Sequence, residues 1–157
     1  MSVEFTDNSA KVKEAMNDAL IAYLYEAGGE LETAVKREAA RDSGQTRNAW
    51  AYKVDESKGE CAVGNPQENA LWEEFGTGEH ALEGKGRKSP WYIPVDSYKG
   101  KKKPTFQGKV VVVHGKDGID FYKTDGKKPK RTLQTAFNKK KPKLVKRIGT
   151  ILKEKLS

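Results

Sequence analysis

The chain has 157 residues and a net charge of +8, with 33% charged and only 36% apolar residues. This length suits one domain with a core of its own, and the composition requires much of the chain to stay in water or to meet another subunit. The single cysteine, Cys61, excludes an intrachain disulfide and a cysteine-based zinc site, and we expect a buried structural thiol there.

Residues 7–41 are predicted to form a long helix, because their apolar residues recur at helical spacing. A polar residue among 7–9 is suited to cap the first turn. Gly28 and Gly29 interrupt the middle, where each glycine costs about 1 kcal/mol relative to alanine. The helix is therefore expected either to kink or to let another backbone pack closely at this point. Residues 43–44 are typical of a helix end.

A first hairpin is predicted after this helix. Residues 48–55 alternate aromatic and apolar side chains on one face, which indicates a strand. A turn at residues 57–59 leads into a returning strand at residues 60–63.

A short helix is expected over residues 69–75, followed by a glycine-rich, charged loop over residues 76–90. We interpret Trp72 and Phe75 as core anchors of this helix. Residues 76–78, Gly-Thr-Gly, are interpreted as a hinge from which the loop leaves the body of the protein.

Residues 91–95 are a strand candidate, and Pro94 places it at a sheet edge or bulge. An exposed, lysine-rich loop is expected over residues 97–108. Residues 109–114 and 119–123 then predict a second hairpin, since they are rich in β-branched residues and flank a turn.

The C-terminal part is predicted to be helical in two pieces. Thr132 is suited to cap a first piece that runs to Asn138, and Pro142 fits the first position of a last helix over residues 141–156. The sum is an α+β fold: a long N-terminal helix and a C-terminal helix packed on a small antiparallel sheet of about four to five strands, with long basic loops. We expect residues 1–157 to be a single domain in which loops 76–90 and 97–108 are flexible.

The charge is divided unevenly along the chain. Residues 1–80 hold 8 Lys and Arg against 16 Asp and Glu, whereas residues 81–157 hold 22 against 6. Such asymmetry is typical of a polyanion-binding half, or of a molecule whose opposite faces meet neighbours of opposite sign. The second interpretation suits a head-to-tail ring.

The sequence contains no constellation of catalytic residues, and we predict neither enzymatic activity nor a cofactor nor a metal. The two histidines, His80 and His114, are 34 residues apart. Glu73 and Glu74 are adjacent, so their side chains diverge and do not share a substrate. The glycine-rich loops lack the order of residues that cradles phosphate and magnesium.

Basic residues interleaved with aromatics leave nucleic-acid binding open as an alternative function. A solvated charged face is the simpler interpretation of the same residues. The residues concerned are Lys85, Arg87, Lys88 and 99–103, with Trp91, Tyr92, Tyr98 and Phe106 beside them.

Three segments in order resemble the neck proteins of long-tailed bacteriophages, known as head–tail joining, tail-completion or minor tail components. The pattern of that family is a long helix, then Asp-Thr-Gly-x-Leu-Arg-Asn-Ser, then Glu-Phe-Gly-Thr-Gly, then Pro-Phe-Leu-x-Pro-Ala entering the last helix. Residues 42–48 resemble the first motif, with Ser43 and Thr46 as departures, and residues 74–78 match the second in full. The third is degraded, because its second proline is missing from residues 129–136.

This resemblance implies a structural protein of a phage or prophage virion that is assembled in the bacterial host cytoplasm. It implies a homo-oligomeric ring, a hexamer in the virion, between the head connector and the tail tube. A chain that is monomeric in solution would still assemble on its partners, and DNA would only pass through the ring. The N-terminal residues lack the features of a signal peptide and no apolar run has membrane length, so no membrane contact is expected. The candidate interface residues are Glu73, Glu74, Phe75, Gly76, Thr77, Gly78, Arg87, Lys88, Lys101, Lys102 and Lys103.

Overall fold

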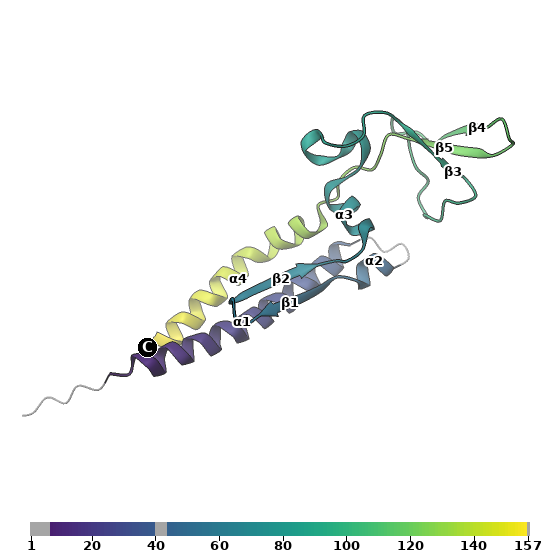
Figure 1. Ribbon diagram of the computed structural model, residues 1–157. Helices are drawn as coiled ribbons and strands as arrows, with labels where there is room; N and C mark the ends of the chain where they lie inside the picture. The colour runs from purple at the N-terminus through teal and green to yellow at the C-terminus, as the bar shows by residue number, and fades with distance from the viewer. Residues whose placement is uncertain (1–6, 40–43, 157) are drawn as a thin grey trace, which may run out of the picture. The chain divides into compact units, whose positions relative to one another are not determined.

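The computed structural model describes residues 7–39 and 44–156, and it confirms the α+β class (Figure 1). The predicted last residue of the first helix, at position 41, and the Asp42 and Ser43 that follow it lie outside the described residues. The elements are α1 (Ser9–Glu38), α2 (Gln45–Asn48), β1 (Ala51–Asp55), β2 (Glu60–Gly64), α3 (Glu68–Phe75), β3 (Trp91–Pro94), β4 (Val111–His114), β5 (Asp120–Thr124) and α4 (Thr132–Leu156).

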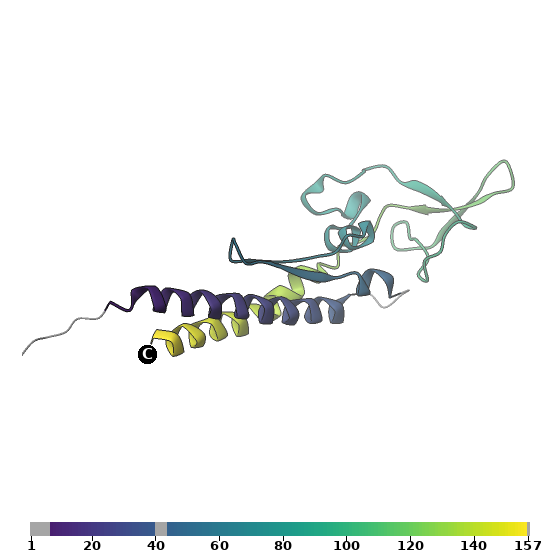
Figure 2. The same ribbon diagram turned by 60° about the horizontal axis from the view of Figure 1, so that its bottom comes forward.

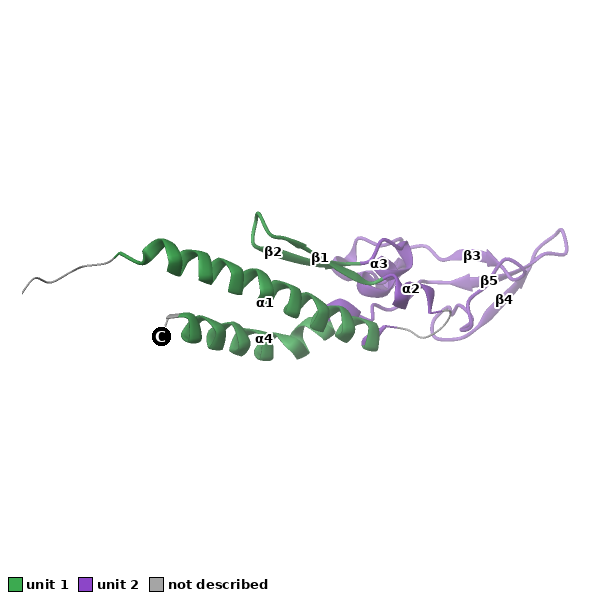
Figure 3. Cartoon of the chain, turned by 90° about the horizontal axis from the view of Figure 1, so that it is seen from below, with its two compact units in different colours: residues 1–37, 50–64, 135–157 green, residues 38–49, 65–134 purple. Residues whose placement is uncertain are grey.

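The chain divides into two compact units, coloured separately in Figure 3. Unit 1 comprises residues 1–37, 50–64 and 135–157, and unit 2 comprises residues 38–49 and 65–134. The five strands are shared between the units in two sheets rather than joined in one. Unit 1 holds the β1–β2 pair, and unit 2 holds a three-stranded sheet in the order β3-β5-β4.

Unit 1 is an antiparallel pair of long helices with a hairpin against α1 (Figures 1 and 2). The Tyr23 hydroxyl of α1 donates a hydrogen bond to the Leu144 carbonyl of α4 at 2.9 Å. In the hairpin, Tyr52 pairs with Val63 and Val54 with Cys61. These four side chains are half-buried while their neighbours along both strands are mostly exposed, so the predicted alternation is confirmed.

The glycine pair of α1 marks the point where the hairpin packs, and the helix runs through it without a break. A β-carbon on Gly28 would overlap the Tyr52 ring and lie 2.8 Å from the Cys61 sulfur. The close neighbours are thus side chains rather than a second backbone. Burial raises the pKa of the Cys61 thiol, which is half-buried.

Helix α4 is continuous from Thr132 to Leu156, so the predicted break before Pro142 is wrong. A proline inside a helix removes one backbone hydrogen bond, here to the carbonyl of Asn138, at a cost of about 3 kcal/mol. Buried apolar residues on both sides of the proline, Ala136 and Leu144, give the physical reason why the helix continues.

The two units bury different kinds of side chain. The buried apolar residues of unit 1 are Ala27, Ala34, Val35, Trp50, Ala136, Leu144 and Ile151. In unit 2 they are Ala39, Ala70 and Tyr122, beside the buried polar residues Glu73, Thr124, Asp125 and Thr132. Trp72 and Phe75 are exposed, so their interpretation as core anchors is wrong. The reason is that α3 turns Ala70 and Glu73 inward instead.

Candidate functional site

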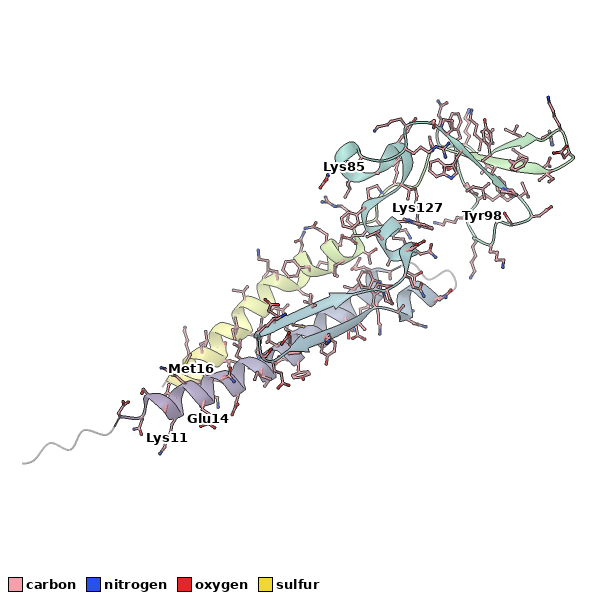
Figure 4. All side chains as sticks on the ribbon, in the orientation of Figure 1. Lys11, Glu14, Met16, Lys85, Tyr98 and Lys127 are labelled. Atoms are coloured by element: carbon pink, nitrogen blue, oxygen red, sulfur yellow. The ribbon has the colours of Figure 1, made fainter. Side chains whose placement is uncertain are left out.

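Helix α3 is held to its own chain by a buried carboxylate. Glu73 accepts hydrogen bonds from the ammonium groups of Lys127 at 2.9 Å and Lys130 at 3.3 Å, and Figure 4 labels Lys127. The backbone N–H of Lys130 also donates to the Glu73 carbonyl at 2.7 Å. Burial on its own raises the pKa of Glu73, but the two lysines outweigh it and hold that pKa below the ordinary value. Glu73 is therefore charged at neutral pH.

The neighbouring Glu74 caps the next helix. Its two carboxylate oxygens accept the backbone N–H groups of Leu133 at 2.7 Å and Gln134 at 3.1 Å, in the first turn of α4. Thr132, the predicted cap, is buried, and its hydroxyl has no hydrogen-bond partner among the described residues. A carboxylate satisfies two free N–H groups at once and opposes the positive end of the helix dipole, which explains why it replaces the hydroxyl.

The Gly-Thr-Gly turn is packed against the chain that leaves β5. The Thr77 N–H donates to the Lys127 carbonyl at 2.9 Å, and the Glu79 N–H donates to the Asp125 carbonyl at 2.9 Å. The Thr77 hydroxyl accepts the Lys127 N–H at 2.9 Å. A β-carbon on Gly78, which has φ +61°, would overlap the Asp125 carbonyl. The interpretation as a free hinge is therefore wrong, because the two backbones are in direct contact.

The loop after this turn folds back on it. Residues 78–80 and 82–84 form two short 3₁₀ turns. A β-carbon on Gly86 would overlap the Gly78 carbonyl, so the loop passes close to its own start. The Arg87 guanidinium lies over the Trp91 ring at 5.8 Å. The flexibility expected of residues 76–90 and 97–108 stays a prediction.

Asp125 is a buried residue of the site that sequence reasoning missed. Its carboxylate accepts the Gln107 N–H at 2.8 Å and lies 3.5 Å from His80 Nε2. The hydrogen bond from Gln107 is the main reason why the pKa of Asp125 lies below its ordinary value, with His80 adding to it. The Thr-Asp-Gly order at residues 124–126 is a turn signal that marks this position in the sequence.

The basic candidate interface residues are exposed and fall in two groups, Arg87 with Lys88 and the lysines at 101–103. No described hydrogen bond or ion pair joins one group to the other. Lys88, Lys101, Lys102 and Lys103 have no ion pair among the described residues. The loop that carries the three lysines is shaped by Tyr98, labelled in Figure 4, whose hydroxyl donates to the Lys102 carbonyl. Nearby in sequence, the Lys123 ammonium lies 4.0 Å from the centre of the Phe106 ring.

The opposite charges of the two halves of the chain meet within unit 1. Arg147 of α4 donates to Glu26 of α1 at 3.2 Å, and Lys140 pairs with Glu30 at 3.4 Å. Lys143 also pairs with Glu30, and the two lysines lower the pKa of that carboxyl. Part of the charge asymmetry that the sequence suggested for neighbouring subunits is thus used inside one chain.

Comparison with models of known protein families, with curated proteins and with solved structures finds no match for this chain. Among the described residues, no helix is both long and apolar enough to cross a membrane. Within the same residues, no cluster of three or more His, Cys, Asp or Glu side chains is placed to hold a metal ion.

Proposed function

We propose that the chain is a structural virion-assembly protein of a long-tailed bacteriophage or prophage. It is a neck component, of the head–tail joining or tail-completion kind, and it forms a ring between the head connector and the tail. It has no catalytic role. Its partners are further copies of itself and the adjoining connector, neck or tail-tube proteins, and DNA only passes through the ring.

One observation carries the proposal: the segments that resemble the second and third family motifs bind each other. Glu74 caps the turn that contains Leu133, and a β-carbon on Gly76 would lie 2.9 Å from both the Lys127 carbonyl and the Pro129 ring. Two segments some fifty residues apart therefore form a single structural device. This physical dependence supports the interpretation of their order in the sequence as one family pattern rather than as two chance matches.

The exposed basic residues have a role in this proposal. Arg87, Lys88 and the lysines at 101–103 are assigned to contacts with acidic surfaces of neighbouring subunits. Such contacts raise the association rate and set the register of assembly, and they weaken with salt.

The test is complementation of a phage that lacks this gene. The wild-type chain is expected to restore joined virions, whereas heads and tails accumulate separately without it, as counted by electron microscopy. Replacing all three lysines, K101Q, K102Q and K103Q, should lower the yield of joined particles. If the phage that lacks the gene still produces joined virions at the wild-type level, the proposal is refuted.

A second candidate function, nucleic-acid binding by the isolated chain, is favoured by the exposure of Lys99 and residues 101–103 near the Lys123–Phe106 pair. It predicts micromolar binding of duplex or single-stranded DNA with a steep dependence on salt concentration. Fluorescence anisotropy with labelled DNA at two salt concentrations separates the candidates, because the neck proposal expects weak or no binding by the monomer.

A further inference from the structure

Helix α3 turns its apolar side chains outward. Leu71 is 58% exposed, Trp72 46% and Phe75 51%, whereas Ala70 and Glu73 are buried. With 3.6 residues per turn, Leu71, Trp72 and Phe75 lie on one side of the helix together with Glu68. We call these four residues the α3 face. A contiguous exposed apolar patch of this kind is typical of an interaction site.

The orientation of α3 is fixed by its charged side. Glu73 is bound by two lysines, and Glu74 caps α4. Turning the α3 face inward would rotate Glu73 and Glu74 away from their partners and break both carboxylate contacts, which is costly. The apolar side chains are therefore held outward by the same residues that bind the helix to its own chain.

Helix α4 has a second apolar stripe that is also open. Its buried residues Ala136, Leu144 and Ile151 are each followed by an exposed apolar residue. Phe137, Val145 and Leu152 repeat the same spacing about 100° further round the helix, with half-buried Ile148 between them. Lys141 and Lys155 fall on this side too. We call these six residues the α4 stripe.

The charges on the two surfaces are complementary. Glu68 lies in line with the apolar residues of the α3 face, and Lys141 and Lys155 lie in line with those of the α4 stripe. All three are exposed, and none takes part in an ion pair or hydrogen bond of its side chain within the described chain. Opposite charges set among apolar residues favour one docking register over others.

We propose that the α3 face of one copy docks on the α4 stripe of a second copy of this chain. The contact joins two different surfaces, so it is head-to-tail and generates a ring when the rotation closes. The inference rests on the proposed function, in that it names the contact from which the neck ring is built. Three apolar side chains on the α3 face and four on the α4 stripe bury less than the ~1,200 Å² of a stable complex, so a single contact is weak and gains strength on ring closure.

Crosslinking tests the contact directly. In full-length C61S protein, E68C is mixed with K141C and treated with a short bis-maleimide, the two variants carrying tags of different size. Docking predicts on the order of tenfold more heterodimer than in a mixture of E68C with K146C, because docking raises the effective concentration of the thiols from μM to mM. Lys146 is exposed and lies on another side of α4, so it is the matched control.

A charge exchange gives an independent readout. The single variants E68K and K141E should each reduce ring formation, as counted in negative-stain images and measured by sedimentation. The double variant E68K/K141E should restore it. Failure of the double variant to recover refutes the assigned pairing, and equal crosslinking at positions 141 and 146 refutes the docking.

The outcomes separate this inference from the proposed function. Rings and joined virions with no 68–141 crosslink overturn the inference alone. A 68–141 crosslink in a chain that does not support head–tail joining leaves the contact in place and overturns the function. If L71S and F75S abolish joining while rings persist, the α3 face binds another virion protein, and the inference is wrong.

Discussion

The two units of this chain use charge in opposite ways. In unit 1, apolar side chains fill the space between helices and hairpin, and the carboxylates of Glu26 and Glu30 pair with α4 at the surface. In unit 2, few apolar residues are buried, and Glu73 and Asp125 lie inside with charged or backbone partners. Unit 2 is therefore held by a small number of specific polar contacts and close backbone approaches. Loss of one such contact should matter more there than loss of a surface pair in unit 1.

The largest effect is expected at Gly78. G78A places a methyl group on the Asp125 carbonyl at a positive φ, and neither backbone can move without breaking the Thr77–Lys127 and Glu79–Asp125 hydrogen bonds. We expect a loss of at least about 3 kcal/mol in the free energy of unfolding, measured by urea denaturation. Hydrogen exchange should show the loss in unit 2.

Gly84 is the matched control, because it also has a positive φ, +66°, and no atom beyond its two chain neighbours lies within 4 Å of the position that a β-carbon would take there. G84A should cost only the conformational penalty of about 1–2 kcal/mol. Equal losses for the two variants would mean that contact with Asp125 adds nothing.

The next effect concerns the buried carboxylate. E73A removes the partner of Lys127 and Lys130 and should lower the free energy of unfolding by about 2 kcal/mol, less than for a fully buried pair because both lysines reach solvent. E83A is the comparison, because it removes the pair of Glu83 with Lys85, in which both side chains are exposed. Its free energy of unfolding should change by no more than about 0.5 kcal/mol.

The contact of Glu73 with Lys127 and Lys130 also predicts how the stability of the protein depends on pH. The folded-state pKa of Glu73 lies below its ordinary value, so its stabilisation is present above about pH 4.3 and is lost as the pH falls through the folded pKa. The difference between wild type and E73Q in the free energy of unfolding should therefore shrink between about pH 5 and pH 3. A difference that grows on acidification contradicts a lowered pKa.

Periodicity predicted the parts of the fold that rest on long apolar repeats. The long N-terminal helix and all five strands are found close to their predicted bounds, whereas the two predicted C-terminal pieces form the single helix α4. It failed on α3, because eight residues with apolar positions at 71, 72 and 75 define a face but not the direction in which that face points. The direction depends on Lys127 and Lys130, more than fifty residues away.

The candidate site shows the same limit. The segment that matches the second family motif contains Glu74, Gly76 and Gly78, and the structure shows a close contact for each of them. That Glu74 would cap α4 in place of Thr132 was not predictable, since capping patterns are recognised only between residues close in sequence. Pro142 was misread as a helix start for a related reason: its local penalty is outweighed by burial on both sides.

In unit 1 the glycine pair tests whether apolar packing is the main support. G28A brings a methyl group into the Tyr52 ring and should destabilise the protein by about 1–2 kcal/mol. G29A meets only the Tyr52 ring at 4.0 Å and should stabilise it by up to about 1 kcal/mol through helix propensity. Thermal denaturation of the two variants gives opposite shifts in Tm. Shifts of the same sign would refute close packing of the hairpin at Gly28.

The smallest effect separates the two uses of charge. E30Q weakens two pairs at the edge of the helix interface and should cost about 0.5–1 kcal/mol at low salt. Because Lys143 is largely exposed, this loss should disappear in 1 M salt, where the screening length is about 3 Å.

E14Q is the control, at an exposed position of α1 with no ion pair among the described residues, and it should leave the free energy of unfolding unchanged at either salt concentration. The loss in E73A should persist in high salt, since Glu73 is shielded from solvent; if both losses vanish together, the two units do not differ in how they use charge.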